Sequence, residues 1–357
     1  MLKRKGNLRR QDEITHERFM MSSIRDVASL AGVSPATVSR ILNNDPTYKT
    51  TPETRQNVLR AVAELDYKPL VKRRKKDVSA ADAHRLSIGC VMVSTKGKYS
   101  DPYFLSILSG VEQELEKHGG HVTSIYTTQE LLNESTMSSL LSAKLDGLVL
   151  MCQVEEPLYE LLHAHFPHIV GLDTGSVPID SVEYDHALVS RMAVEYLYNK
   201  GHRQIGFIGG GLWGSSLNLS RRFRSYRETM RDLGLEIRPE WVIDCEWDDK
   251  TCMKLVDRIV RSGRMPTAFY AASDLMAMAA LRALYMAGVR VPQDVAVMGM
   301  SNIEMSQYAN PPLTTINVPT VEMGIAVART LLGRIHGDTT LPKHILLPSV
   351  LVERDSV

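Results

Sequence analysis

The pattern that most limits the fold begins at Leu86, where short apolar runs start to alternate with longer amphipathic stretches. The apolar runs have the length of buried strands, and they are RLSIGCVMV, KLDGLVLM, HIVGLD, RQIGFIGG, TAFYAAS and DVAVMGM. Between them lie sequences with helical spacing of apolar residues, such as YFLSILSGVEQELEKHG and ALVSRMAVEYLYNKG. Strands that alternate with helices in this way form parallel sheets covered by helices. Residues 86–357 are too many for one such sheet with its helices, and their number fits two.

Residues 22–69 have a different pattern, which predicts three short helices. Gly32 permits a turn after the first helix, and Ser34-Pro35 and Thr51-Pro52 each place an N-cap residue before a proline at the first helical position. Two helices joined at a glycine turn and supported by a third make a helix-turn-helix. The predicted inward positions are Ile24, Val27, Ala28 and Ala31, then Val38, Ile41 and Leu42, then Val58, Val62 and Leu65.

The outward face of the second helix indicates what this unit contacts. In a helix-turn-helix the N-terminal part of that helix enters the major groove of DNA. The face carries Pro35, Ala36, Thr37, Ser39 and Arg40, which are short side chains, hydroxyls and one arginine. An ordinary helical hairpin would explain the apolar spacing, but it would not explain the two caps, the turn glycine and the local basic charge together. We therefore expect this face to bind DNA.

Charge is distributed unevenly along the chain. Residues 1–85 contain 18 lysines and arginines and 10 aspartates and glutamates, a net charge of +8. Residues 86–357 contain 24 and 31, a net charge of −7, and the two sum to the +1 of the whole chain. A basic end on an acidic remainder is typical of a protein that approaches a polyanion with one end. A solvated basic linker would give the same numbers.

Composition excludes several other classes of protein. No apolar run reaches the ~18 residues of a membrane span, and no apolar segment follows the basic N-terminus as it would in a secretory signal. Cys90, Cys152, Cys245 and Cys252 form no CxxC pair, so we expect buried free thiols, no metal site and a cytoplasmic protein. Residues 1–21 are either a basic arm or the result of a start codon placed too far upstream.

The sequences IRDVASLAGVSPATVSRILN and TPETRQNVLRAVAELDYKP resemble the DNA-binding domain of the LacI/GalR family of transcriptional regulators. GHRQIGFIGG, RRFRSYRETM, ASDLMAMAALRAL and NPPLTTINVP resemble the family's periplasmic-binding-protein-like domain, so the resemblance covers nearly the whole chain. Within the family, LNNDPTYK and SNIEMSQYANPPLTTI resemble most the evolved β-galactosidase repressor, or galactose-type, branch.

The resemblance implies an all-α helix-turn-helix head and an α/β core of two doubly wound parallel-sheet subdomains connected by three crossovers. The expected domains are an N-terminal extension (1–21), a DNA-binding domain (22–69), a basic hinge (70–85) and an effector-binding core (86–357). Within the core, we expect an N-subdomain of residues 86–198 and 318–347 and a C-subdomain of residues 199–317 and 348–357.

Carried over by position, the resemblance implies two sets of DNA-binding residues. Pro35, Ala36 and Arg40 match base-reading positions, and Arg40 is the strongest of them because arginine can bind guanine with two hydrogen bonds. The phosphate-binding positions match Ser23, Ile24, Ser34, Thr37, Ser39, Asn43, Thr51 and Thr54.

The hinge departs from the family pattern. Leu70 replaces the usual asparagine, and Lys76 stands where a leucine normally inserts into the minor groove. Lys72, Arg73 and Arg74 belong to a run of five basic residues, 72–76. This run is either a phosphate-binding hinge, with Leu70 or Val71 as a displaced wedge, or a disordered basic linker. Either interpretation predicts strongly salt-dependent DNA binding.

Ligands of open α/β sheets bind outside the carboxyl ends of the strands, and the resemblance implies a sugar between the two subdomains. Sugar hydroxyls need bidentate polar partners, and one face of the ring needs an aromatic platform. The matching positions are Asp185 as an acceptor, Arg222 as a hydroxyl clamp, Trp247 as the platform, Ser273 and Asn302. Asp274 is expected either to contact the ligand or, in preference, to cap the helix that follows it. Ser301-Asn302 replaces family aspartates, which weakens the case for a simple galactoside.

The segment 209–214, GGGLWG, satisfies the dinucleotide pattern GxGxxG after a strand. That site also needs a second strand ending in an acidic residue about twenty residues further on, and arginines intervene here. We therefore expect no cofactor and no enzymatic activity.

The sequence thus predicts a homodimeric repressor of a carbohydrate operon that binds pseudopalindromic operator DNA under the control of a sugar-like effector. No heptad repeat follows LVERDSV, so a tethered tetramer is not expected. The alternatives are a sugar-binding transport protein, which would need a signal sequence and no head, and an NAD-dependent enzyme.

Overall fold

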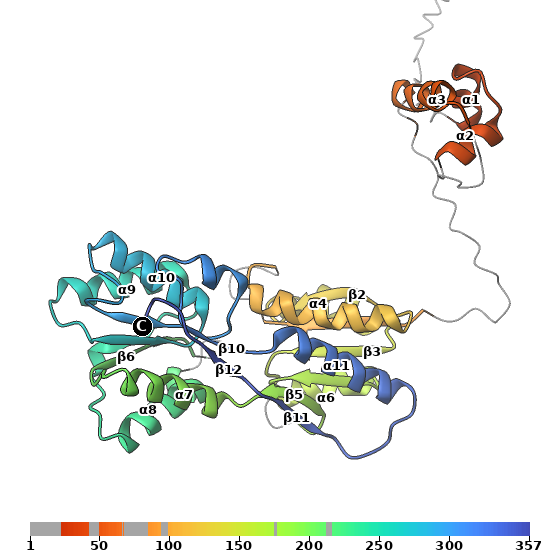
Figure 1. The fold of residues 1–357 in the computed structure, drawn as a ribbon. Helices are drawn as coiled ribbons and strands as arrows, with labels where there is room; N and C mark the ends of the chain where they lie inside the picture. Colours follow the sequence, from red (N-terminus) through yellow and green to blue (C-terminus); the bar gives the residue numbers. More distant parts are fainter. Residues whose placement is uncertain are drawn as a thin grey trace, which may run out of the picture. The chain divides into compact units, whose positions relative to one another are not determined.

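The computed structural model describes residues 23–42, 50–65, 67, 85–93, 99–174, 177–211 and 216–357. The chain forms two compact units, residues 1–83 (the head) and 84–357 (the body). Figure 1 shows the helices of the head and the two sheets of the body. The predicted extension and nearly all of the predicted hinge lie outside the described residues.

The head consists of three helices, α1 (Ile24–Leu30), α2 (Pro35–Leu42) and α3 (Pro52–Glu64). Gly32 has a φ of +66°, so the turn between α1 and α2 uses the left-handed conformation that glycine adopts without strain. The two Pro-initiated helices begin where the sequence predicts. The core contains Val27, Ala28, Val38, Ile41, Val58 and Ala61, and the other predicted inward residues pack partly buried against it.

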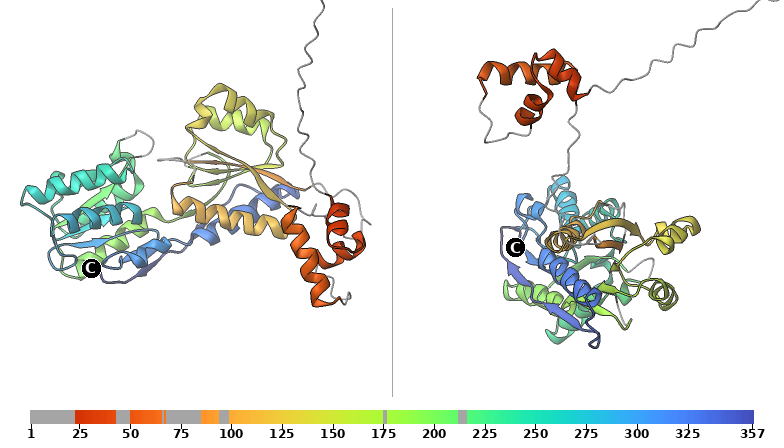
Figure 2. Two further views of the ribbon diagram at one scale, coloured as in Figure 1. Left: turned by 90° about the horizontal axis from the view of Figure 1, so that it is seen from above. Right: turned by 90° about the vertical axis from the view of Figure 1, so that its right-hand side faces the viewer.

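The first sheet of the body has six strands in the order β11-β5-β4-β3-β1-β2, all of them parallel to their neighbours. Helices α4 and α11 cover one face of this sheet and α5 and α6 the other (Figure 2, left). The strands are β1 (Ser87–Met92), β2 (His121–Thr127), β3 (Gly147–Met151), β4 (Ile169–Leu172), β5 (Asp180–Tyr184) and β11 (His344–Leu347), and the helices are α4 (Pro102–Lys117), α5 (Glu134–Ser142), α6 (Glu156–His165) and α11 (Thr320–Ile335).

The second sheet has four parallel strands in the order β7-β6-β8-β9. Helices α7 and α8 lie on one of its faces and α9 and α10 on the other (Figure 1). Its elements are β6 (Ile205–Gly209), β7 (Val242–Asp244), β8 (Ala268–Ala271), β9 (Ala296–Met298), α7 (His186–Asn199), α8 (Arg221–Asp232), α9 (Asp249–Arg261) and α10 (Asp274–Met286), with short 3₁₀ turns such as η2 (Leu217–Leu219) and η4 (Glu304–Tyr308) between them.

Strands β3, β4, β6, β8 and β9 are apolar and buried throughout, because both faces of each sheet are covered there. In β1, Ile88, Cys90 and Met92 pack into the core beneath α4 and α11, whereas Val91 packs into the core on the α5 and α6 side. All four cysteines are buried and free, as expected. In the part of the chain that the structure describes, no helix has both the length and the apolar composition to cross a membrane.

The chain passes between the two subdomains three times, after β5, after β10 (Thr315–Asn317) and before β12 (Val350–Val352), and β10 and β12 pair antiparallel. The predicted boundary at residue 198 needs moving, because α7 packs against the second sheet. The hydroxyls of Ser190 and Tyr270 are 3.0 Å apart, and Ser225 Oγ donates to the Ala187 carbonyl. The first subdomain therefore ends near β5, before α7.

Helices α4 and α11 come into close backbone contact. A Cβ built on Gly110 would lie 2.1 Å from the Val321 carbonyl oxygen, and one built on Gly324 would lie 2.0 Å from that of Ile107. A carboxylate joins the same two helices, since Glu114 on α4 accepts from Arg329 Nε on α11 at 2.8 Å and from Lys117 Nζ at 2.7 Å.

The hydrogen bonds of Glu114 predict how the stability of the body changes at low pH. Its hydrogen bonds from Arg329 and Lys117 lower its pKa to about 2. A carboxyl group whose pKa is lower in the folded state stabilises that state above its unfolded pKa of about 4.3, and the effect is lost as the pH falls toward 2. We expect Glu114→Gln to lower the free energy of unfolding near neutral pH. Between pH 4 and 2 that free energy should then decrease less than it does in the wild type. Urea unfolding at several pH values measures this, and Glu116→Gln, exposed on the same helix, is the control.

Candidate functional site

The outward surface of α2 is the first candidate site. Ser34, Pro35, Ala36 and Arg40 are exposed, and Thr37 and Ser39 are partly exposed. The opposite face of α2 is held in the core by Val38 and Ile41. The predicted DNA-binding residues Asn43, Lys72, Arg73 and Arg74 lie outside the described residues. The described part of the predicted surface is therefore accessible on a rigid support.

Apart from Ser39, which lies in the middle of α2, the predicted phosphate-binding hydroxyls of the described residues lie at or near the starts of the three helices. Ser34 Oγ accepts from the Thr37 amide at 3.1 Å, and Thr51 Oγ1 accepts from the Thr54 amide at 3.2 Å. Ser23 at the start of α1 donates to Asp26 at 2.7 Å through both its amide and its hydroxyl, and Ile24 next to it is partly buried. Helix N-termini carry partial positive charge and unpaired amides, so they suit phosphate oxygens.

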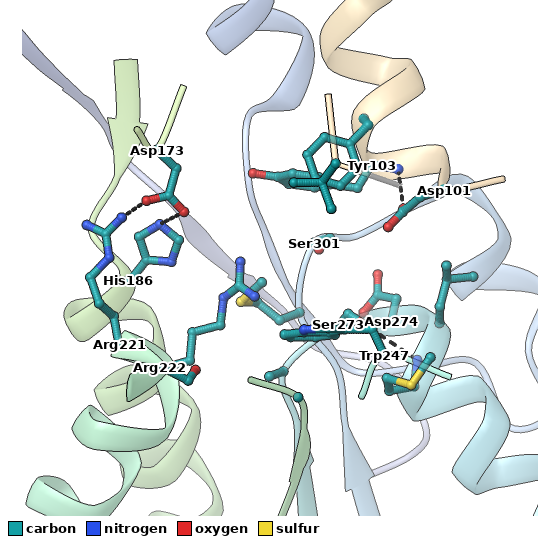
Figure 3. A pocket seen from close by; sticks show the side chains of 18 of the residues that line it. Asp101, Tyr103, Asp173, His186, Arg221, Arg222, Trp247, Ser273, Asp274 and Ser301 are labelled. Atoms are coloured by element: carbon teal, nitrogen blue, oxygen red, sulfur yellow. Dashed lines mark hydrogen bonds and ion pairs between the residues drawn. The ribbon is translucent and has the colours of Figure 1, made fainter. Parts of the chain in front are cut away.

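The second candidate site is a cavity of about 350 Å³ between the two subdomains of the body. It lies where the strands of both sheets end, which is where α/β sheets bind ligands. Figure 3 shows the side chains that point into it. The first subdomain contributes residues around Asp101, Tyr103 and Asp173, and the second contributes residues around Arg222, Trp247, Ser273 and Ser301.

The cavity walls include strained backbone. Among the described residues, every non-glycine residue with a positive φ lies in or next to the wall: Asp173, Glu246, Trp247, Ser301 and Asn302. L-residues adopt this conformation at a cost of about 1–3 kcal/mol, and such strain concentrates at functional sites. The surrounding contacts must therefore hold these loops in place.

Arg222 is the cationic centre of the cavity (Figure 3). Its Nε donates to the Tyr184 hydroxyl at 2.9 Å, and its guanidinium carbon lies 5.5 Å from the centre of the Trp247 ring. Burial acts to lower the pKa of Arg222, but the facing Tyr184 and Tyr103 outweigh burial and raise it. Arg222 thus stays charged beside an aromatic surface and can donate to a ligand in the cavity.

Trp247 is fixed by the glycines that follow β6. Its indole Nε1 donates to the Gly211 carbonyl at 2.8 Å. A Cβ on Gly210 would lie 2.8 Å from the indole ring and 2.9 Å from the Trp247 amide nitrogen. These glycines therefore let the tryptophan approach the backbone, a use unrelated to a dinucleotide. Residues 212–215, the rest of the GxGxxG pattern, lie outside the described residues.

Asp274 supports the wall of the cavity. Ser273, and not Asp274 as the sequence suggested, caps α10, because Ser273 Oγ accepts from the Met276 amide. The Asp274 carboxylate instead accepts from the Thr315 hydroxyl at 2.6 Å and from the Ile303 amide at 2.8 Å. Burial is the main cause that raises its pKa to about 6. Asp274 thereby connects the 301–303 loop to β10, one of the strands that join the subdomains.

A charged cluster lies on the other side of the cavity. Arg221 forms ion pairs with Asp173 and with Glu183, the latter at 3.0 Å. His186 is buried, and its Nε2 lies 3.1 Å from Asp173 Oδ2. Burial, followed by the charge of Arg222, lowers the pKa of His186 to about 3. His186 is therefore neutral at physiological pH.

The structure brings three of the five predicted effector residues into the cavity lining, namely Arg222, Trp247 and Ser273. Asp185 does not line it, because its carboxylate caps α7 by accepting from the Ala187 and Leu188 amides at 3.0 and 2.9 Å. Asn302 does not line it either. Its amide group bonds Asn317 and Arg354, away from the cavity, while its neighbours Ser301 and Ile303 form the wall.

Sequence reasoning missed Asp101, Tyr103, Asp173, His186 and Arg221. Asp173 could have been recognised as a site residue from the sequence, because it directly follows the strand run HIVGL. Asp101 could have been recognised too, since Asp-Pro at the start of a helix marks a cap, and Asp101 Oδ1 does accept from the Tyr103 amide at 3.0 Å. Within the described residues, no group of three or more histidine, cysteine, aspartate or glutamate residues could hold a metal ion.

Comparisons with known proteins agree with this architecture. Residues 23–69 match the family model for bacterial regulatory proteins of the lacI family, and residues 194–357 match that for the periplasmic binding protein-like domain. The chain is 34% identical over 345 residues to the HTH-type transcriptional repressor MelR of Bacillus subtilis (strain 168), covering 94% of this chain and 97% of MelR.

Solved structures of similar proteins match the same two-part architecture. A complex of the transcriptional regulator CelR with cellobiose matches with a TM-score of 0.69 and 30% identity, covering 94% of this chain and all of CelR. A lac repressor dimer bound to operator and the anti-inducer ONPF matches with a TM-score of 0.67 and 26% identity, covering 94% of this chain and 98% of that chain.

A helix-turn-helix head joined to a cavity-bearing body of this fold defines a DNA-binding transcriptional regulator controlled by a small molecule. The chain belongs to the lacI family of bacterial regulatory proteins, as the MelR relationship over nearly its whole length shows. The predicted fold class is confirmed. The narrower galactose-type branch stays a prediction.

Proposed function

We propose that this regulator represses genes for carbohydrate use and that a sugar in the cavity between the subdomains controls its affinity for operator DNA. The observation that carries the proposal is the pairing of a charged, partly buried Arg222 with the Trp247 ring in one cavity. Arginine donates to hydroxyl oxygens, and an indole face packs against the apolar side of a sugar ring. The resemblance to a regulator solved with cellobiose supports a ligand of this kind.

On this proposal the head binds DNA through the exposed surface of α2, with Arg40 reading a base and the hydroxyls at the helix starts holding phosphates. A pseudopalindromic operator requires two heads, so the active species is a homodimer in the cytoplasm. The protein acts by binding and not by catalysis. A transport protein would use the same cavity but has no use for the head.

Arg222→Ala should leave operator binding intact and weaken the response to sugar. Each charged hydrogen bond that is lost costs about 1.5–3 kcal/mol, so the sugar concentration needed for half the response should rise at least about tenfold. Fluorescence anisotropy of labelled operator, titrated with neutral mono- and disaccharides, measures both properties. Arg224→Ala, exposed on the same helix, is the matched control. A normal response in Arg222→Ala would remove the cavity as the effector site.

A further inference from the structure

The described lining of the cavity has more acidic than basic side chains. It includes two guanidinium groups, Arg221 and Arg222, and five carboxyl groups, at Asp101, Asp173, Asp244, Glu246 and Asp274. His186 adds no positive charge, because burial and the nearby Arg222 keep its pKa near 3. The potential that a ligand meets in this part of the cavity is therefore negative overall, which disfavours an anion.

One of the two guanidinium groups is already occupied. Arg221 lies between two carboxylates, Asp173 in the cavity wall and Glu183 on β5, with Glu183 Oε2 3.0 Å from Nη1. Glu183 itself is nearly buried, and it also accepts from the Ser181 hydroxyl at 2.9 Å. A phosphate could reach Arg221 only by displacing Asp173 or Glu183, and Glu183, which is nearly buried, would then lose its ion pair with Arg221, which is costly. Figure 3 shows Arg221 turned toward Asp173 and Arg222 turned into the cavity.

We propose that the cavity takes an uncharged polyhydroxy effector and that Asp173 and Glu183 are specificity residues, which exclude phosphorylated and acidic sugars by holding Arg221 in ion pairs. This inference rests on the proposed function for what the effector does, while the exclusion of anions is a property of the cavity itself. A neutral hydroxyl group can accept from Arg222 and donate to a carboxylate such as Asp101, so it suits this lining. The phosphoryl group of a sugar phosphate dianion has no proton to donate, so its oxygens could only accept and would meet mostly acceptors.

The inference is tested by measuring whether a variant of the full-length protein gains affinity for phosphate. Asp173→Asn/Glu183→Gln keeps the shape of both side chains but removes both charges that hold Arg221. Isothermal titration with inorganic phosphate and with glucose 6-phosphate should show little binding to the wild type and binding at least about tenfold tighter to the double variant. Asp173→Asn alone should give a smaller gain, because Glu183 still pairs with Arg221.

Two controls assign the gain to Arg221. Asp244→Asn/Glu246→Gln removes the same formal charge from the lining but frees no guanidinium, so its affinity for phosphate should rise much less than that of the first variant. Adding Arg221→Ala to the first variant should abolish the gained binding. Operator binding and circular dichroism of each variant establish that it is folded.

The outcomes separate this inference from the proposed function. Phosphate or glucose 6-phosphate binding to the wild type as tightly as to Asp173→Asn/Glu183→Gln would overturn the inference. Equal gains in the two double variants would also overturn it, because bulk charge would then explain the result. If cellobiose, lactose and other neutral sugars leave operator affinity unchanged while phosphate binding appears only after the substitution, the proposed sugar response fails and the exclusion of anions stands.

Discussion

Gly324→Ala should strongly destabilise the body. The added Cβ would lie 2.0 Å from the Ile107 carbonyl oxygen and 2.8 Å from the Val111 amide nitrogen, and both are backbone atoms of α4. Neither can move without separating α4 from α11. Overpacking usually costs about 1–3 kcal/mol and can exceed this where backbone must shift. We expect about 3 kcal/mol or more, a large share of the ~5–15 kcal/mol that stabilises a typical domain.

Urea unfolding monitored by circular dichroism measures this loss, and Gly333→Ala on the same helix is the matched control. A Cβ at Gly333 would meet only the Asp338 Cβ at 4.0 Å. Alanine has a higher helix propensity than glycine by about 1 kcal/mol, so this variant should be unchanged or more stable. If Gly324→Ala were as stable as Gly333→Ala, the close approach of α4 and α11 would be wrong.

Arg40→Ala should remove most of the sequence preference of DNA binding. A bidentate contact from arginine to guanine contributes about 1–3 kcal/mol of discrimination, and a dimer loses it in both half-sites. Binding to random duplex should persist and stay salt-dependent, because phosphate contacts supply it. The measurement is anisotropy with a duplex selected by the wild type from a random pool, compared with a scrambled duplex, at two salt concentrations.

Arg60→Ala provides the comparison for Arg40→Ala. Arg60 is exposed on α3 and not on the recognition surface of α2, so its loss should affect selected and scrambled duplexes alike. If Arg40→Ala kept the wild-type ratio of the two affinities, α2 would not be the helix that reads the bases, and the assignment of Pro35 and Ala36 beside it would fall as well.

Coupling between the two sites must pass through the body, and Asp274 suggests one route. It bonds both the cavity wall, at Ile303, and β10, at Thr315. A ligand that shifts the 301–303 loop would change the same contacts that position the crossover strand. Linkage then requires that the effector change operator affinity by the factor by which operator changes effector affinity.

The sequence alone predicts the architecture where patterns are local. Cap residues and prolines located α2 and α3, and runs of apolar residues located β1, β3, β4, β6, β8 and β9. It did not predict β5, whose sequence DSVEY looks like a loop although every residue in it is buried. The strand is possible because Arg334 pairs with Asp180 and Arg221 with Glu183. Both partners are distant in the sequence.

The residues that line the cavity could also be predicted only in part, because they too meet across long separations in the sequence. Helical and strand periodicity, caps and turn glycines act over a few residues, so they were enough to predict a DNA-binding head and two α/β subdomains. The resemblance to the family then pointed to Arg222, Trp247 and Ser273. The folded chain was needed to show that Asp185 caps a helix, that Asn302 turns toward Arg354, and that Asp173 and Arg221 meet across the subdomains. The orientation of a polar side chain depends on partners that only folding brings near it.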